Sequence, residues 1–326
     1  MDNKVTELKE ILGERVLVHE PLGKYTTFKI GGPADYFFDA KTTDDLVSAV
    51  TAGRNLGLPV CILGGGTNIL VGDHGIRGLV VRNSTRVITI RGAKGKRFRG
   101  KSDDVVFVEA DSGVVFNQLV RFTVEEGLAG LEMQLGLPGS VGGAVFMNSK
   151  WTHPVGYVGD AVYQAEILSP QGERKIVPKS YFQFAYDTSV IQKTGDIVLT
   201  VVFALKTDSK ENLWKTATES VKYRQLTQPQ GVHSPGCTFR NISKAEALAA
   251  STPDHTTSAG FLVDHAGLKG AGVGDAEISS VHANFIINRG RATARDVVQL
   301  IERVRAKVKE KFGVTLEEEI VRIGEF

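Results

Sequence analysis

The sequence has little of what marks a secreted or membrane-embedded protein. Its 326 residues include only two cysteines, Cys61 and Cys237, which disfavours a disulfide framework or a zinc cluster and favours a reducing compartment. No uncharged apolar run approaches the roughly 20 residues that a membrane helix needs. The opening stretch, MDNKVTELKEILGERVLV, shows no apolar signal-peptide core. We therefore expect a cytoplasmic protein that has no membrane partner and binds no metal.

The charge balance lacks an excess of either sign. A net charge of +2 does not indicate a nucleic-acid binder, but the segment 91–101 is strongly basic. It is either a patch for phosphates or nucleic acid or the solvated tip of a hairpin. We interpret it as a hairpin tip, because Phe98 is its only aromatic residue. Its basic residues are Arg91, Lys94, Lys96, Arg97, Arg99 and Lys101.

Length and patterning predict an α+β protein with more than one domain. A chain of 326 residues fits two or three domains, and the predicted strands and helices do not alternate as a Rossmann sheet requires. Thr43 should cap the first predicted helix; Thr293 and Asp296 should form a capping box on the last, which should end at Gly313. The predicted helices are 43–57, 116–126, 213–224 and 294–312, and the predicted strands are 58–63, 78–82, 86–91, 105–110, 162–168 and 196–205.

Two glycine-rich stretches are candidates for binding an extended anion. The first, GGGTN at 64–68, follows a predicted strand directly. Its backbone N–H groups can converge on a phosphate without Cβ obstruction, although a tight turn explains it equally well. The second, 136–148, is rich in small residues, and close-packed turns would also explain it. Together the two stretches suggest a multi-phosphate ligand such as a dinucleotide.

Blocks of sequence along nearly the whole chain resemble the UDP-N-acetylenolpyruvoylglucosamine reductase (MurB) family. Any one block is weak evidence, but their order and spacing together are specific. For example, SPGCTFRN at 234–241 resembles the family's S-A-G-S/C-x-F-K/R-N motif. The other blocks are YTTFKIGGPA (25–34), GGGTNIL (64–70), GLPGSVGGAVFMN (136–148), AGFL (259–262), GLKG (267–270), HANFI (282–286) and FGVTLEEEI (312–320).

The resemblance implies an α+β architecture, with an FAD-binding domain of the p-cresol methylhydroxylase type and a smaller α+β substrate-binding domain. The FAD domain would cover 1–210, with subdomains of about 1–85 and 86–210 and the tail 315–326 packing back; the substrate domain would cover 211–314. It further implies that NADPH is the co-substrate and a UDP-sugar the substrate. We expect a monomer.

The resemblance also assigns the cofactor site. The first glycine stretch would hold the FAD pyrophosphate, and the second would run beside the flavin. FAD should be bound non-covalently, because no histidine stands where related oxidases attach their flavin. The implied FAD-binding residues are Gly64, Gly65, Gly66, Thr67, Asn68, Gly113, Pro138, Gly139, Ser140, Gly142, Gly143, Ala144 and Ile197.

The reaction that the resemblance implies is the reduction of an enolpyruvyl ether on the UDP-sugar. This reaction needs a hydride, a proton, and stabilisation of the charge that develops on the carboxylate. Cys237 aligns with the family's proton donor and Glu319 with its catalytic glutamate; by residues alone, an inert cysteine and a solvated acidic run remain alternatives. Asp187 stands where the family has an arginine, so either another cation serves or the alignment is locally shifted. Candidates for that cation are Arg224, Arg240 and Lys269. The candidate UDP-binding residues, each otherwise an ordinary surface residue, are Lys222, Arg224, Arg240, Asn241, His282 and Asn284.

Two other functions remain open on the sequence. A flavoprotein oxidase of a sugar or hydroxy acid would use oxygen as electron acceptor. A degenerate nucleotide-sugar binding protein would purify without the yellow colour of a flavin.

Overall fold

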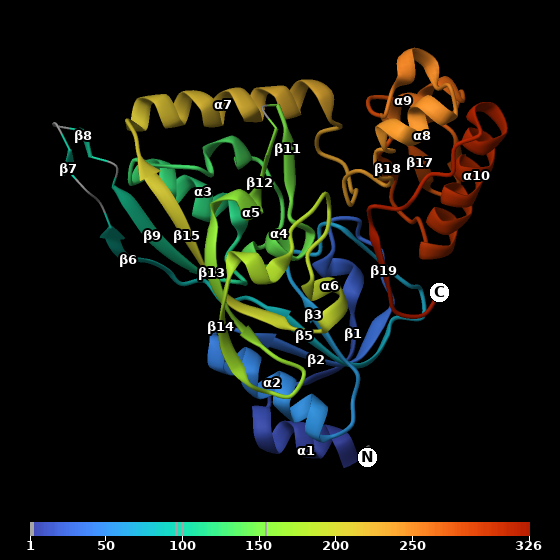
Figure 1. Cartoon of the computed structure of the whole chain (residues 1–326). Coiled ribbons are helices and arrows are strands. Elements are labelled where there is room, and N and C mark those ends of the chain that lie inside the picture. Colours follow the sequence, from blue (N-terminus) through green and yellow to red (C-terminus); the bar gives the residue numbers. More distant parts are fainter. Residues whose placement is uncertain (1–2, 95–96, 99–100, 103, 154) are drawn as a thin grey trace. The chain divides into compact units, whose positions relative to one another are not determined.

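The computed structural model describes residues 3–94, 97–98, 101–102, 104–153 and 155–326. Helices and strands are mixed along the chain (Figure 1), as expected for an α+β protein. The chain forms two compact units. Unit 1 is Met1–Leu17, Phe37–Gly65 and Gly78–Arg224, and unit 2 is Val18–Tyr36, Gly66–Arg77 and Gln225–Phe326.

Unit 1 contains two groups of strands. In the first, β3 (Val60–Leu63) runs parallel to β5 (Ile76–Asn83), which neighbours β2 (Pro33–Ala40). The part of β5 from Gly78 and the part of β2 from Phe37 belong to unit 1. The second is a six-stranded sheet of order β14-β13-β15-β9-β6, with β10 paired to β15. Its strands are β6 (Ile88–Lys94), β9 (Val105–Asp111), β10 (Leu128–Ala129), β13 (Val162–Leu168), β14 (Arg174–Pro178) and β15 (Ile197–Thr207).

The core of unit 1 lies between this sheet and several helices. Phe203 of β15, Leu119 of α3 and Ala217 of α7 belong to one buried apolar cluster. Burial of such apolar side chains is the main contribution that stabilises the folded state. The helices of this unit are α1 (Asn3–Leu12), α2 (Thr43–Asn55), α3 (Phe116–Glu125), α4 (Val141–Met147), α5 (Val158–Ala161), α6 (Ile191–Thr194) and α7 (Lys210–Thr227), with a hairpin of β11 (Lys150–Thr152) and β12 (Val155–Tyr157).

Unit 2 has its own core around α10 (Ala294–Phe312). Val297, Ile301 and Val304 of this helix are fully buried with Leu262 of α9, and the strands β19 and β4 pair in parallel. The other elements are β1 (Leu17–Pro21), β4 (Ile69–Val71), α8 (Lys244–Ala249), α9 (Ala259–His265), β16 (Gly272–Val273), β17 (Ala276–Ile278), β18 (Ile286–Asn288) and β19 (Val321–Ile323). Within the described part of the chain, no helix is long and apolar enough to cross a membrane.

Local sequence signals located the helix ends well, with one correction. The capping box of Thr293 and Asp296 and the left-handed Gly313 after α10 are confirmed. The cap of α2 is Thr42, whose side chain accepts from the amide of Asp45, whereas Thr43 is already helical. The prediction of Thr43 was wrong because adjacent threonines offer the same side chain, and only the backbone conformation decides which one lies outside the helix.

The described residues of the basic segment lie in paired antiparallel strands, as the hairpin prediction requires. β6 pairs antiparallel with β9, and β7 (Arg97–Phe98) pairs with β8 (Lys101–Ser102) beyond them (Figure 1). Arg91 and Lys94 are exposed, and Arg91 forms an ion pair with Glu109 on the neighbouring strand. Lys96 and Arg99 lie outside the described residues.

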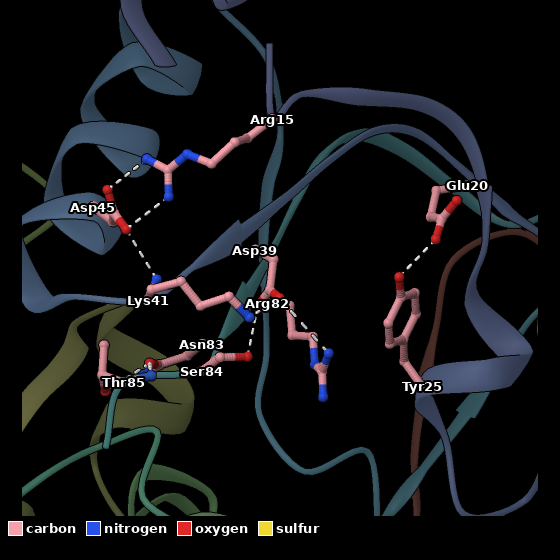
Figure 2. Close-up of polar contacts among 10 residues, drawn as sticks. All are labelled: Arg15, Glu20, Tyr25, Asp39, Lys41, Asp45, Arg82, Asn83, Ser84 and Thr85. Carbon is pink, nitrogen blue, oxygen red and sulfur yellow. Dashed lines mark hydrogen bonds and ion pairs between the residues drawn. The ribbon is translucent and has the colours of Figure 1, made fainter. Parts of the chain in front are cut away.

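Asp45 at the start of α2 provides a pH-dependent contribution to stability. Its carboxylate receives two hydrogen bonds from Arg15, of 2.7 and 3.0 Å, and one of 3.0 Å from the amide of Lys41 (Figure 2). The Arg15 guanidinium is the main reason why the pKa of Asp45 falls from 3.8 to about 2. Because the folded pKa is depressed, the stabilisation is present above the unfolded pKa and is lost as pH falls from about 4 to about 2.

We expect Asp45→Asn to lower the free energy of unfolding at neutral pH by on the order of 1 kcal/mol, since the pair is largely solvent-screened. Urea unfolding of the protein at several pH values measures this. The difference from wild type should shrink as the pH is lowered toward about 2. A difference that stays constant over this range would show that the ion pair is not its cause.

Candidate functional site

The two glycine-rich stretches touch each other within unit 1. A Cβ atom added to Gly65 would lie 2.6 Å from the Cα of Gly139, and one added to Gly64 would lie 2.5 Å from Oγ of Ser140. Real Cβ atoms do not approach other atoms this closely, so glycine is required for the backbones to meet. The tertiary structure therefore brings Gly64 and Gly65 together with Gly139 and Ser140, as a joint role in binding one ligand requires.

A third segment, around Gly113, joins this arrangement. The amide of Gly142 donates to the carbonyl of Ser112 at 2.7 Å, and Asn83 Nδ2 donates to Ser112 Oγ, also at 2.7 Å. A Cβ on Gly113 would lie 2.6 Å from the amide of Thr85. Ile197 begins β15, two residues before Leu199, whose carbonyl accepts from the amide of Ser112. The predicted residues Gly113, Gly142 and Ile197 thus belong to adjoining segments.

The second glycine stretch contains a helix that the sequence did not indicate. Ser140 caps α4, and its Oγ accepts from the amide of Gly143. Ala144 lies inside α4, and Pro138 is exposed just before it. Glycine disfavours helix intrinsically, so α4 depends on tertiary packing, including that of Gly142 against Ser112.

The residues of the first stretch have donors to offer to an anion. Within the described part of the chain, the amides of Gly65, Gly66 and Thr67 donate to no acceptor, and Gly66 is buried. Asn68 Nδ2 donates to the carbonyl of Glu319 at 3.2 Å. Backbone N–H groups of a glycine-rich stretch that donate to no acceptor among the described residues are of the kind that binds the oxygens of a pyrophosphate. This stretch is therefore compatible with the phosphates of FAD.

Cys237 and Glu319 lie on hydrogen-bonded neighbouring segments of unit 2. The segment 237–240 lies between two others: the amide of Thr238 donates to the carbonyl of Asn284 at 2.7 Å, and the amide of Glu319 donates to the carbonyl of Thr238 at 2.8 Å. Cys237 and Glu319 are both half-buried. No atom would lie within 4 Å of a Cβ on Gly236, so the residue before the thiol borders open space.

The three adjacent glutamates differ in their surroundings. Glu318 accepts from Arg322 at 2.7 Å and pairs with Arg305 at 3.0 Å, and Glu317 is exposed. Glu319 is hydrogen-bonded through its backbone to the segment that carries Cys237. The sequence alone could not separate these residues, because the difference lies in their tertiary partners.

Several predicted substrate residues support the backbone of this segment. The buried Asn284 donates to the carbonyl of Phe239 and accepts from its amide, at 2.8 and 2.9 Å. Asn241 Oδ1 accepts from the amide of Ala259. Burial, aided by the charge of Lys269, lowers the pKa of His282, so its ring is held toward the neutral form.

The candidate cations are dispersed over the two units. Asp187 is buried in a tight turn between Ala185 and Thr188, with a left-handed φ of 52°. In unit 1, Lys222 is exposed on α7, and the Arg224 guanidinium lies over the Trp151 ring. In unit 2, Arg240 follows the segment of Cys237, and Lys269 pairs with Asp264 at 2.6 Å.

Comparison with known proteins defines the class first. The chain matches the FAD binding domain family over residues 34–177 and the C-terminal domain of UDP-N-acetylenolpyruvoylglucosamine reductase over residues 228–323. Its fold resembles that of a VAO-type flavoprotein from Myceliophthora thermophila, with a TM-score of 0.56 at 10% identity, over 95% of this chain and 85% of that one. The fold is therefore that of an FAD-binding flavoprotein, as predicted.

The family follows from full-length relatives. The chain is 36% identical to UDP-N-acetylenolpyruvoylglucosamine reductase of Lachnoclostridium phytofermentans, over 98% of this chain and 96% of the relative. It is 37% identical to the reductase of Moorella thermoacetica, over 98% of this chain and 97% of that relative. The crystal structure of the Thermus caldophilus reductase (MurB) matches with a TM-score of 0.74 and 32% identity, over 94% of this chain and 98% of that one. The chain belongs to the UDP-N-acetylenolpyruvoylglucosamine reductase family.

Proposed function

We propose that this protein reduces UDP-N-acetylglucosamine enolpyruvate to UDP-N-acetylmuramate with NADPH, a step in peptidoglycan precursor synthesis, and that it acts as a monomer in the cytoplasm. The observation that carries the proposal is the junction of the two glycine stretches, where Gly65 and Gly139 meet backbone to backbone. Family membership over the full length supports the same activity.

FAD, when bound, supplies the chemistry of accepting a hydride from NADPH and passing it to the enolpyruvyl double bond. The chain's own residues bind and orient the reactants. The amides of Gly65, Gly66 and Thr67 would hold the FAD pyrophosphate, with Gly64 and Asn68 shaping the turn. The remaining FAD-binding residues are Gly113, Pro138, Gly139, Ser140, Gly142, Gly143, Ala144 and Ile197.

Cys237 holds the proton that the product carbon receives, and Glu319, on the adjacent segment, assists this protonation. Cations are needed for the UDP diphosphate and for the charge that develops on the carboxylate. Asp187 cannot supply a positive charge, so this task falls to other residues. The residues proposed for the UDP-sugar are Lys222, Arg224, Arg240, Asn241, His282 and Asn284.

The assay that tests this function is NADPH oxidation with and without the UDP-enolpyruvyl sugar. We expect a yellow protein that consumes NADPH in multiple turnovers only when the sugar is present. NADPH or substrate oxidation coupled to oxygen alone would indicate an oxidase. A colourless protein would indicate a nucleotide-sugar binding protein.

Acid precipitation tests how the flavin is held. Because binding is expected to rest on backbone amides and packing, precipitation should release all of the yellow colour into the supernatant. Colour that stays in the pellet would demonstrate a covalent bond and contradict this expectation.

A further inference from the structure

An aromatic residue in unit 1 holds one of the candidate cations in place. The Cζ atom of Arg224 lies 4.0 Å from the ring centroid of Trp151, which is within the range of a cation–π interaction. Trp151 is only 3% exposed. Its ring forms a T-shaped pair with that of Tyr223, with the ring centroids 5.8 Å apart, and Tyr223 in turn stacks on His153 with the centroids 4.9 Å apart.

The Arg224 side chain also meets the second glycine stretch. A Cβ on Gly136 would lie 2.9 Å from Cδ of Arg224. The arginine therefore contacts both an indole face and the backbone that leads to Gly139 and Ser140. A long side chain held in this way loses less conformational entropy when it binds a ligand.

The backbone around Trp151 is itself fixed. Trp151 pairs with Gly156 across the β11–β12 hairpin, and Gln134 Nε2 donates to the carbonyl of Gly156 at 3.2 Å. A Cβ on Gly156 would lie 2.6 Å from Sδ of Met133. The hairpin is thus packed tightly against the segment just before the second glycine stretch, and the indole has little freedom to move.

We propose that Trp151 is a positioning residue, which orients the Arg224 guanidinium to bind an oxyanion of the UDP-sugar. The proposal rests on the proposed function, since it specifies a cation of that same site. Guanidinium matches both phosphate and carboxylate in geometry, so the oxyanion is either the diphosphate or the enolpyruvyl carboxylate.

Trp151→Leu removes the ring and leaves Arg224 in the chain. We expect the KM for the UDP-enolpyruvyl sugar to rise about 3- to 30-fold, the range that corresponds to a cation–π interaction. Flavin reduction by NADPH should change less than about twofold and so reports intact folding. Trp151→Phe should retain most of the affinity, because a phenyl face also attracts the guanidinium.

The other tryptophan provides the matched control. Trp214 has Arg121 at 5.9 Å from its ring and packs at the rim of the unit 1 core. Trp214→Leu should leave the KM for the UDP-sugar unchanged. An equal rise in both variants would mean a general loss of packing and would overturn the positioning role.

Two further measurements sharpen the result. Adding Trp151→Leu to Arg224→Ala should cause no further rise in KM, because the tryptophan acts through the arginine; fully additive losses would contradict this. Titration with UDP identifies the oxyanion: weaker UDP binding in Trp151→Leu assigns the diphosphate, and unchanged UDP binding with weaker substrate binding assigns the carboxylate. If wild type lacks the reductase activity, the proposed function fails, whereas an active wild type with an unchanged KM in Trp151→Leu refutes only the positioning role.

Discussion

In the Cys237→Ala variant, NADPH should reduce and bleach the flavin at the normal rate. The reduced flavin should then fail to be reoxidised by the UDP-enolpyruvyl sugar. NADPH reduces the flavin before the enol ether reacts, so that half-reaction does not need the thiol. The second half-reaction adds a hydride and a proton across a double bond, and general acid catalysis contributes about 10²–10⁴-fold. Stopped-flow absorbance of the flavin, recorded separately for the two half-reactions, should show a loss of this size in the second one alone.

The chain offers a matched control in its other cysteine. Cys61 lies in β3, paired with Val80, and burial raises the pKa of its thiol to about 11. Cys61→Ala should leave both half-reactions unchanged. Cys237→Ser should recover part of the lost rate, since a hydroxyl can take the place of the thiol. Reoxidation of Cys237→Ala at the wild-type rate would show that the proton comes from elsewhere, with Glu319 or a bound water as the next candidates.

Gly65→Val should produce a protein that has lost its FAD. The backbone of Gly65 has no positive φ, so the new side chain is not excluded by its own conformation. It is excluded by its neighbour, because the Cβ would lie 2.6 Å from Cα of Gly139. Backbone cannot move aside as a flexible side chain can, so the two glycine stretches must separate. The flavin absorbance of the purified variant, relative to its protein absorbance, measures the loss.

Gly172→Ala is the control for general glycine effects. Gly172 has a φ of +85°, and no atom lies within 4 Å of an added Cβ. Its substitution should cost about 1 kcal/mol of stability through backbone strain and leave the FAD content intact. A folded Gly65→Val protein with full flavin content would show that the junction of the two stretches does not hold the cofactor.

The sequence alone predicted a helix or strand correctly wherever the residues that determine it lie within the element or next to it. The α10 helix was predicted with its capping box and its terminal glycine, because cap, apolar stripe and stop all lie within the helix or next to it. β13 was predicted at Val162–Leu168 for the same kind of reason. The family, and with it the flavoprotein fold, followed from motifs spaced along the chain. The domain boundaries and the roles of individual residues stay predictions.

Other features of the candidate site depend on contacts between distant segments, which no local pattern contains. The α4 helix runs through glycines that disfavour helix, and packing against Ser112 compensates for this. Glu318 pairs with Arg305 and Arg322, whereas the amide of Glu319 donates to the carbonyl of Thr238. The Arg224 guanidinium lies over the indole of Trp151, whereas Lys222 is exposed. The sequence determined which residue types the chain has available for flavin and substrate chemistry. Only the tertiary structure decided which of them meet, because contact requires complementary shape between segments far apart in the chain.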